Sequence, residues 1–234
     1  MTVSAAGLRQ ALDQLADLRS SPLTVEEALE RVVRTADALF GVDGTALMLV
    51  DRDQVLRNLA ASDARAAPLE ELQAEHGEGP CVVAIEDTQP VAVDDLATED
   101  RWPAFARAAA GRGLLGVLAS PIPYSDQAVG VVTVFAGQAH PWTEAEREAI
   151  VAFTELVALL ILNAMEASER GKLAGHLQVA LESRVVIEQA KGVLVGRHGL
   201  TTRQAFDRLR RQARDQRRPL SEVARAVVSA AEHR

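Results

Sequence analysis

Arginine side chains recur along one stretch of the sequence with the spacing of a helix face. The stretch "TRQAFDRLRRQARDQRR" places Ala205, Phe206, Leu209 and Ala213 on the buried face of a helix and sets arginines on the adjacent face. A guanidinium group donates hydrogen bonds in a planar geometry that fits phosphate, and it also stacks on flat bases. The pattern therefore predicts a helix that binds nucleic acid. The arginines on this adjacent face are Arg203, Arg210, Arg214 and Arg217, with Arg211 and Arg218 close by.

The charge of the chain is unevenly distributed. Residues 175–234 hold twelve Lys and Arg against six Asp and Glu, whereas the whole chain has a formal net charge of −8. The C-terminal part is therefore positive and the rest of the chain strongly negative. A basic part attracts polyanions, and an acidic part repels them. The alternative for each single arginine is a solvated surface residue.

One cysteine is placed where a thiol can be activated. Cys81 follows Gly79 and Pro80, and Pro80 suits the first position of a helix. A helix N-terminus lowers the pKa of a thiol, so Cys81 is a candidate redox or electrophile sensor. The alternative is a small buried hydrophobic residue. A single cysteine forms no intramolecular disulfide.

Two aromatic residues, Trp102 and Phe105, are candidates for the lining of a ligand pocket. Their alternative place is the hydrophobic core, where aromatic residues at helical spacing usually lie. The histidines, cysteine and acidic residues show no ligand spacing for a metal and no coherent catalytic constellation. The sequence therefore predicts a protein that is not an enzyme and has no metal site, and it predicts no particular cofactor.

The elements of the acidic part indicate an α+β fold. A helix over "TVEEALERVVRTADALFG" precedes a hairpin of "GTALMLVD" and "VLRNLAAS", and a second hairpin is expected over "LLGVLASPIP" and "QAVGVVTVFAG". Between the hairpins we expect helices near "PLEELQAE", from Cys81 and over "RWPAFARAAAGRG", with a strand near "PVAV". Two hairpins with inserted helices favour one antiparallel sheet covered by helices.

The rest of the chain is predicted to be helical. A capping box at Thr143 and Glu146 opens a long helix that runs toward the basic part. A further helix ends at Gly199, a second begins at a capping box of Thr201 and Gln204, and a third follows Pro219. These patterns divide the chain into a domain of residues 1–165 with an N-terminal helix, a helical linker of residues 166–178 that is a coiled coil or a hinge, and a domain of residues 179–234.

The acidic part resembles a known family of sensory modules. "GEGPCVVAIEDTQPVAVDDLATEDRWPAFARAAAGRGLLGVLASPI" is similar to the GAF domains of bacterial regulators in its G-P-C, D-L, R-W-P-x-F and L-x-x-P-I elements. The resemblance implies a dimeric module that senses a small molecule or a redox change. It does not identify the ligand. The motifs of cyclic-nucleotide-binding, bilin-binding and methionine-sulfoxide-reducing members do not occur in this sequence.

The basic part resembles a second family. "SRVVIEQAKGVLVGRHGLTTRQAFDRLRRQARDQRRPLSEVARAVV" is similar to the ANTAR domain of transcription antiterminators in its I-x-x-A-K-G-x-L, G-L-T, A-F-x-x-L-R-x-x-A and L-S-E-V-A elements. Such domains recognise tandem hairpin loops in nascent leader RNA. They prevent formation of a terminator, so that polymerase reads through. By position in the matched motif, the resemblance implies that the RNA-binding residues are Lys191, Gly192, Arg203, Arg210, Arg211, Arg214 and Arg218.

These resemblances together predict a signal-responsive antitermination regulator. The expected partners are hairpin RNA, RNA polymerase through the nascent transcript, a second copy of the chain and an unidentified small-molecule signal. The longest central apolar run, "VALLILNAM", is too short to cross a bilayer, so a cytoplasmic protein without a membrane partner is expected. The alternative function is that of a DNA-binding transcription factor with a GAF sensor, because a helix-turn-helix has similar size and charge.

Overall fold

The computed structural model describes residues 3–18, 25–51, 56–124, 127–167, 172–216 and 218–232. The chain forms two compact units. The first comprises Met1–Leu49 and Leu56–Glu169, and Arg170–Arg234 make up most of the second. Each unit has a hydrophobic core cluster of its own.

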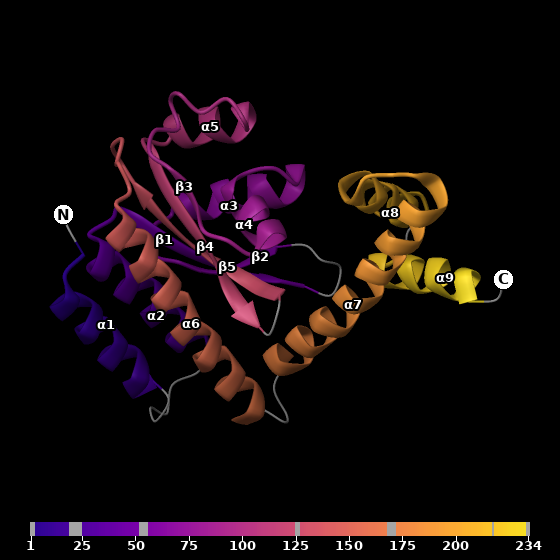
Figure 1. The fold of residues 1–234 in the computed structure, drawn as a ribbon. Coiled ribbons are helices and arrows are strands. Elements are labelled where there is room, and N and C mark those ends of the chain that lie inside the picture. Colours follow the sequence, from indigo (N-terminus) through magenta and orange to yellow (C-terminus); the bar gives the residue numbers. More distant parts are fainter. Residues whose placement is uncertain are drawn as a thin grey trace. The chain divides into compact units, whose positions relative to one another are not determined.

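The first unit is built on a five-stranded sheet with the order β2-β1-β5-β4-β3 (Figure 1). The strands are β1 (Gly44–Val50), β2 (Leu56–Ala61), β3 (Val91–Val93), β4 (Gly116–Tyr124) and β5 (Gln127–Ala136). β5 is antiparallel to both β1 and β4, and β3 is antiparallel to β4. The prediction of one antiparallel sheet in an α+β fold is confirmed.

Helices cover both faces of this sheet (Figure 1). Val117 of β4 lies in a core cluster with Phe105. Ser120 lies on the other face of the same strand, where its hydroxyl oxygen is 3.2 Å from that of Thr154. This alternation follows the two-residue period of a strand. The helices on the Val117 side are α3 (Ala66–His76), α4 (Pro80–Asp87) and α5 (Pro103–Ala110). Those on the Ser120 side are α2 (Val25–Phe40) and α6 (Glu144–Ala167).

The N-terminal helix α1 (Ala5–Leu18) precedes α2, which is the first helix that the sequence predicted by its residues. Its buried residues Ala11 and Leu15 are four positions apart, and the helix packs beside α2 and α6 (Figure 1). Its start does carry a local signal, because the Ser4 hydroxyl accepts a hydrogen bond from the backbone N–H of Gly7 at 3.0 Å. That serine acts as an N-cap for α1.

The predicted capping box of α6 is confirmed. The backbone N–H of Thr143 donates to Glu146 Oε2 at 2.8 Å, and the N–H of Glu146 donates to Thr143 Oγ1 at 3.3 Å. These reciprocal bonds satisfy donors that the first turn of a helix leaves without intrahelical partners. None of the helices in the described ranges combines the length and the apolar character needed to cross a membrane.

In its described residues the second unit contains the helices α7 (Lys172–His198), α8 (Thr202–Gln216) and α9 (Leu220–Glu232). Their buried side chains form one cluster, which includes Ile187, Leu209 and Val223 from the three helices in turn. Gly199 ends α7 with a left-handed φ of 64°, and Thr201 and Gln204 form the expected capping box. The three-helix prediction is confirmed.

The segment predicted as a linker or hinge is only partly described. Residues 168–171 lie outside the described ranges, and residues 172–178 belong to α7. The described part of this segment is therefore helical, and Gly175 does not interrupt the helix.

Candidate functional site

The Gly79-Pro80-Cys81 motif shapes the start of α4. Gly79 precedes the helix with a φ of 132°, and Pro80 occupies its first turn, as the sequence predicted. A Cβ at Gly79 would collide with the side chain of Gln73. Both the backbone conformation and the space therefore require glycine. The missing side chain at Gly79 therefore lets the start of α4 pack closely against Gln73 of α3.

Behind this motif, four polar side chains form a fully buried cluster. Cys81 Sγ lies 3.1 Å from Glu70 Oε2 and 2.9 Å from Thr133 Oγ1. Gln73 Nε2 donates to Glu70 Oε2 at 3.0 Å, and Gln73 Oε1 accepts from the backbone N–H of Cys81 at 2.9 Å. All four side chains are buried, and Glu70 Oε1 has no hydrogen-bond partner among the residues that the structure describes. The cluster ties α3 and α4 to β5.

Burial changes the protonation of both acidic groups in this cluster. It raises the pKa of Glu70 from 4.5 to about 7, although hydrogen bonds with Cys81 and Thr133 oppose the shift. Burial, followed by the nearby charge of Glu70, also raises the pKa of the Cys81 thiol well above its ordinary value. The expectation that the helix N-terminus lowers this pKa is therefore wrong, because desolvation of the thiolate is the largest influence on it.

Trp102 and Phe105 lie in the hydrophobic core of the first unit. Phe105 is 2% exposed and Trp102 is 7% exposed, and both join the cluster that includes Val117 and Phe135. The guanidinium of Arg101 lies 4.3 Å from the centroid of the Trp102 ring. Of the two placements that the sequence left open, both side chains occupy the core.

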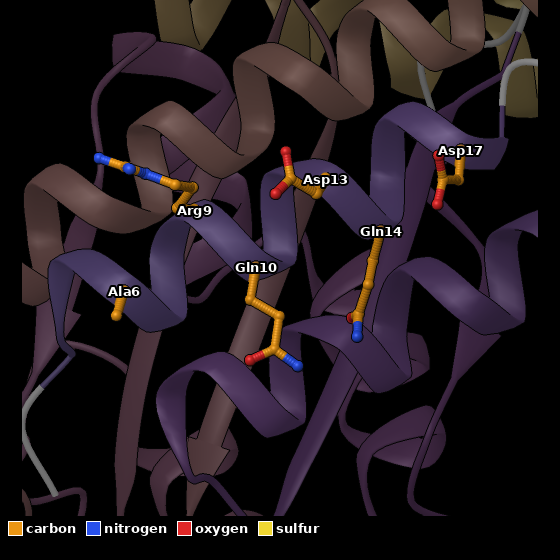
Figure 2. Close-up of a pocket in the computed structure, with 6 residues that line it drawn as sticks. All are labelled: Ala6, Arg9, Gln10, Asp13, Gln14 and Asp17. Carbon is orange, nitrogen blue, oxygen red and sulfur yellow. The ribbon is translucent and has the colours of Figure 1, made fainter.

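A hollow of about 520 Å³ lies along the outer face of α1 (Figure 2). Its described lining comes from α1 alone, whereas small-molecule sites are usually concave clefts in which several elements place a few convergent polar groups. None of the predicted site residues lies among these lining residues. The lining residues are Ala6, Arg9, Gln10, Asp13, Gln14 and Asp17. Across the described parts of the chain, no three His, Cys, Asp or Glu residues come together as metal ligands.

In the second unit, two of the predicted RNA-binding residues meet around one aromatic ring. Lys191 Nζ of α7 and Arg210 Cζ of α8 each lie 5.5 Å from the centroid of Phe206. Lys191 Nζ also pairs with Glu188 Oε1 at 2.7 Å. Phe206, which the sequence assigned to the buried face of α8, is only partly buried against the core cluster. Phe206 and Lys191 lie on different helices, so no local sequence pattern predicted that they would be close together.

The other predicted contact residues lie mostly at the surface of this unit. Arg203, Arg211 and Arg218 are exposed, and Arg218 Nε lies 3.2 Å from Glu222 Oε2. Gly192 is exposed within α7, and a Cβ added there would meet no atom within 4 Å. Packing within the described protein therefore gives no reason for glycine at this position. Arg214 belongs to α8, but its side chain lies outside the described part of the protein.

Two family models match this chain, one in each of its two units. The model of the GAF domain matches residues 22–162, and the model of the ANTAR domain matches residues 175–228. The nitrate regulatory protein of Klebsiella oxytoca is 39% identical over 74 residues, which are 30% of this chain and 19% of that protein. The chain thus spans about a fifth of the length of this relative.

Solved structures with low sequence identity share the fold of the first unit. The GAF domain of a phosphoenolpyruvate-protein phosphotransferase from Coxiella burnetii is similar with a TM-score of 0.56 and 19% identity, covering 70% of this chain and 98% of that one. Free methionine-R-sulfoxide reductase from Neisseria meningitidis has a TM-score of 0.57 and 15% identity, covering 71% of this chain and 96% of that one. At these identities the likeness concerns the fold alone.

Proposed function

The chain belongs to the GAF domain family and carries an ANTAR domain over residues 175–228, and from this membership we propose that it is a signal-responsive regulator of transcription antitermination. Its ANTAR domain binds hairpin loops in nascent leader RNA. Its GAF domain controls that binding. The role is regulatory rather than catalytic, and RNA polymerase is reached through the transcript.

The observation that carries this proposal is the match of residues 175–228 to the ANTAR domain. The geometry of the second unit supports it, because α7, α8 and α9 share one core cluster and so provide a compact scaffold for basic side chains. The cations of Lys191 and Arg210 converge on Phe206 from two of these helices. A scaffold that fixes cations in this way suits an RNA loop, whose phosphates and unstacked bases lie close together.

The charge distribution supports the assignment of RNA binding to this part of the chain. Residues 175–234 hold twelve Lys and Arg against six Asp and Glu, in a chain of net charge −8. Each phosphate that a basic side chain neutralises releases counterions, which makes the binding strongly dependent on salt. The acidic remainder of the chain repels the same polyanion and favours engagement through the ANTAR domain alone.

The control step in this proposal is bivalent binding by a homodimer. A signal at the GAF domain changes dimerisation or the geometry of the helical linker, and so decides whether two ANTAR domains engage paired hairpins together. Two linked sites bind far more tightly than one, by about 100-fold or more when the spacing allows both to engage. The full chain is therefore expected to bind a two-hairpin RNA much more tightly than an RNA with either hairpin alone.

The direct test measures binding of the purified full chain to a tandem-hairpin RNA from the leader regions of its own genome. The comparison RNA has the same stems with altered loops, and both are measured across a salt series. Loop-dependent binding is expected, with a steep decrease in affinity as the salt concentration rises. Arg210→Ala is expected to weaken binding and to reduce the salt slope by about one.

Arg225→Ala provides a matched control, because Arg225 is an exposed arginine of α9 outside the predicted contact set. It is expected to retain loop-dependent binding. A duplex DNA competitor separates the alternative function. If duplex DNA displaces the RNA at equal nucleotide concentration and the loop changes have no effect, the chain is a DNA-binding regulator instead.

A further inference from the structure

Phe206 is left partly exposed although it is the only aromatic residue of residues 175–234 other than histidine. Its neighbours on α8, Ala205 and Leu209, are fully buried, whereas Phe206 packs against the core only in part, as do Val186 and Val195 of α7 and Val227 and Val228 of α9. The ring therefore stands at the edge of the core, with part of its surface open to solvent. This placement differs from that of Phe105 and Phe135 in the first unit, which are almost completely buried.

The exposed ring is flanked by two cations from different helices. Lys191 Nζ and Arg210 Cζ each lie 5.5 Å from the ring centroid, within the range of a cation–π interaction. Lys191 is further oriented by its ion pair with Glu188, and Arg210 follows Phe206 by one helical turn. The structure thus joins an apolar flat surface and two positive charges in one place.

We propose that Phe206 is the stacking platform for one unpaired base of the bound RNA loop, with Lys191 and Arg210 pairing with the phosphates on either side of that base. This inference rests on the proposed function. In the free protein, the two cations lie against the ring. When a base stacks on Phe206, it displaces a cation from the ring, and that cation then pairs with phosphate.

The chemistry of an unpaired nucleotide fits this arrangement. An RNA loop exposes the flat faces of its bases, and aromatic side chains commonly stack on such bases. Stacking on phenylalanine requires no hydrogen-bonding edge, so the platform accepts any base. Recognition of the loop sequence then falls to polar groups around the platform, whereas Phe206 contributes affinity that salt does not screen.

The test compares Phe206→Leu with Phe206→Tyr in the full chain. Leucine keeps an apolar side chain against the core but removes the aromatic face, whereas tyrosine keeps that face. Phe206→Leu is expected to lower the affinity for the tandem-hairpin RNA by about 5-fold to 100-fold, the range for loss of stacking on one base. Its salt slope is expected to stay unchanged, unlike that of Arg210→Ala. Phe206→Tyr is expected to bind within about 3-fold of the original chain.

A spectroscopic readout follows the base itself. 2-Aminopurine is placed at each loop position in turn, and its fluorescence is measured on binding. Quenching at one position is expected with the original chain and with Phe206→Tyr, and it is expected to be lost with Phe206→Leu at saturating protein. Thermal unfolding of each variant checks that α7–α9 remain folded. If leucine unfolds them, Phe206→Met takes its place.

The outcomes separate this inference from the function on which it rests. Equal affinity and equal quenching for the original chain and Phe206→Leu overturn the stacking proposal while RNA binding stands. Loop-independent binding by the original chain overturns the proposed function and the stacking proposal together. Loss of affinity in Phe206→Leu with a reduced salt slope and unchanged quenching shows that Phe206 merely positions the cations, and this too contradicts stacking.

Discussion

The thiol of Cys81 lies 3.1 Å from Glu70 Oε2 in a fully buried cluster that joins α3, α4 and β5. The two side chains come from different helices, and Thr133 of the sheet lies 2.9 Å from the same sulfur. The sequence motif around Cys81 suggested an activated thiol. The contacts instead indicate an uncharged thiol that helps to hold the GAF core together.

Replacing Glu70 with glutamine is expected to flatten the dependence of stability on pH. Burial raises the pKa of Glu70 from 4.5 to about 7, so the folded protein holds one more proton than the unfolded chain between these values. The free energy of unfolding therefore falls as the pH rises through this window, and the loss is complete above about pH 7. The free energy of unfolding of Glu70→Gln, relative to that of the original chain, is therefore expected to rise by up to about 3 kcal/mol as the pH increases from about 4 to about 8.

Denaturant unfolding of the GAF domain at several pH values measures this difference. Glu71→Gln is the matched control, because it removes one carboxyl group from the exposed neighbouring position. Parallel pH profiles for Glu70→Gln and the original chain would show that Glu70 is ionised within the core, contrary to the protonation inferred from its burial.

Cys81 is expected to react very slowly with thiol reagents while the protein is folded. Its side chain is fully buried, and burial raises its pKa, so the reactive thiolate is scarce at neutral pH. The rate is measured with an aromatic disulfide reagent that releases a coloured thiolate when it reacts with a thiol. Because the chain has one cysteine, the colour reports on Cys81 alone. The same reaction in guanidinium chloride is expected to be fast and stoichiometric. Fast labelling of the folded protein would restore the sensor-thiol hypothesis.

The elements that the sequence predicted well are those with local signals. The capping boxes of Thr143 with Glu146 and of Thr201 with Gln204 are each contained within four residues, and both appear in the structure. The hairpin of β4 and β5 likewise follows from two neighbouring apolar runs. Such features depend on hydrogen bonds and turns that adjacent residues complete by themselves.

The features that the sequence did not predict depend on contacts between distant residues. Thr133 lies 52 positions from Cys81, and Lys191 reaches Phe206 from another helix. Residue spacing does not reveal such tertiary contacts, so neither the buried cluster nor the flanked ring was predicted. The raised pKa of Cys81 follows from that same tertiary burial, which a motif of three residues does not encode.

Gly192→Ala is expected to separate stability from RNA binding. A Cβ at this exposed position meets no atom within 4 Å, so alanine is expected to stabilise α7 by about 1 kcal/mol through its higher helix propensity. If RNA approaches the backbone of α7 at Gly192, the added methyl group lowers affinity at the same time. Thermal unfolding and RNA titration of the full chain measure the two effects.

Gly196→Ala is the matched control for that experiment. Gly196 lies one turn further along α7, is also exposed and has the same open space around an added Cβ, but it is outside the predicted contact set. It is expected to gain stability without loss of RNA affinity. Equal RNA affinity for Gly192→Ala and the original chain would exclude close approach at Gly192.

Single-round transcription in vitro tests the central claim most directly. The template carries a leader with tandem hairpins before a terminator, and the fraction of full-length transcript is measured with increasing amounts of the purified chain under conditions that permit dimerisation. We expect the chain to increase read-through on this leader. A leader with altered loops is expected to leave termination unchanged, and Arg210→Ala is expected to need a higher protein concentration for the same read-through. Two results would contradict the account of this protein as a loop-specific antiterminator. One is read-through that does not change although the chain binds the RNA. The other is read-through that increases equally on the leader with altered loops.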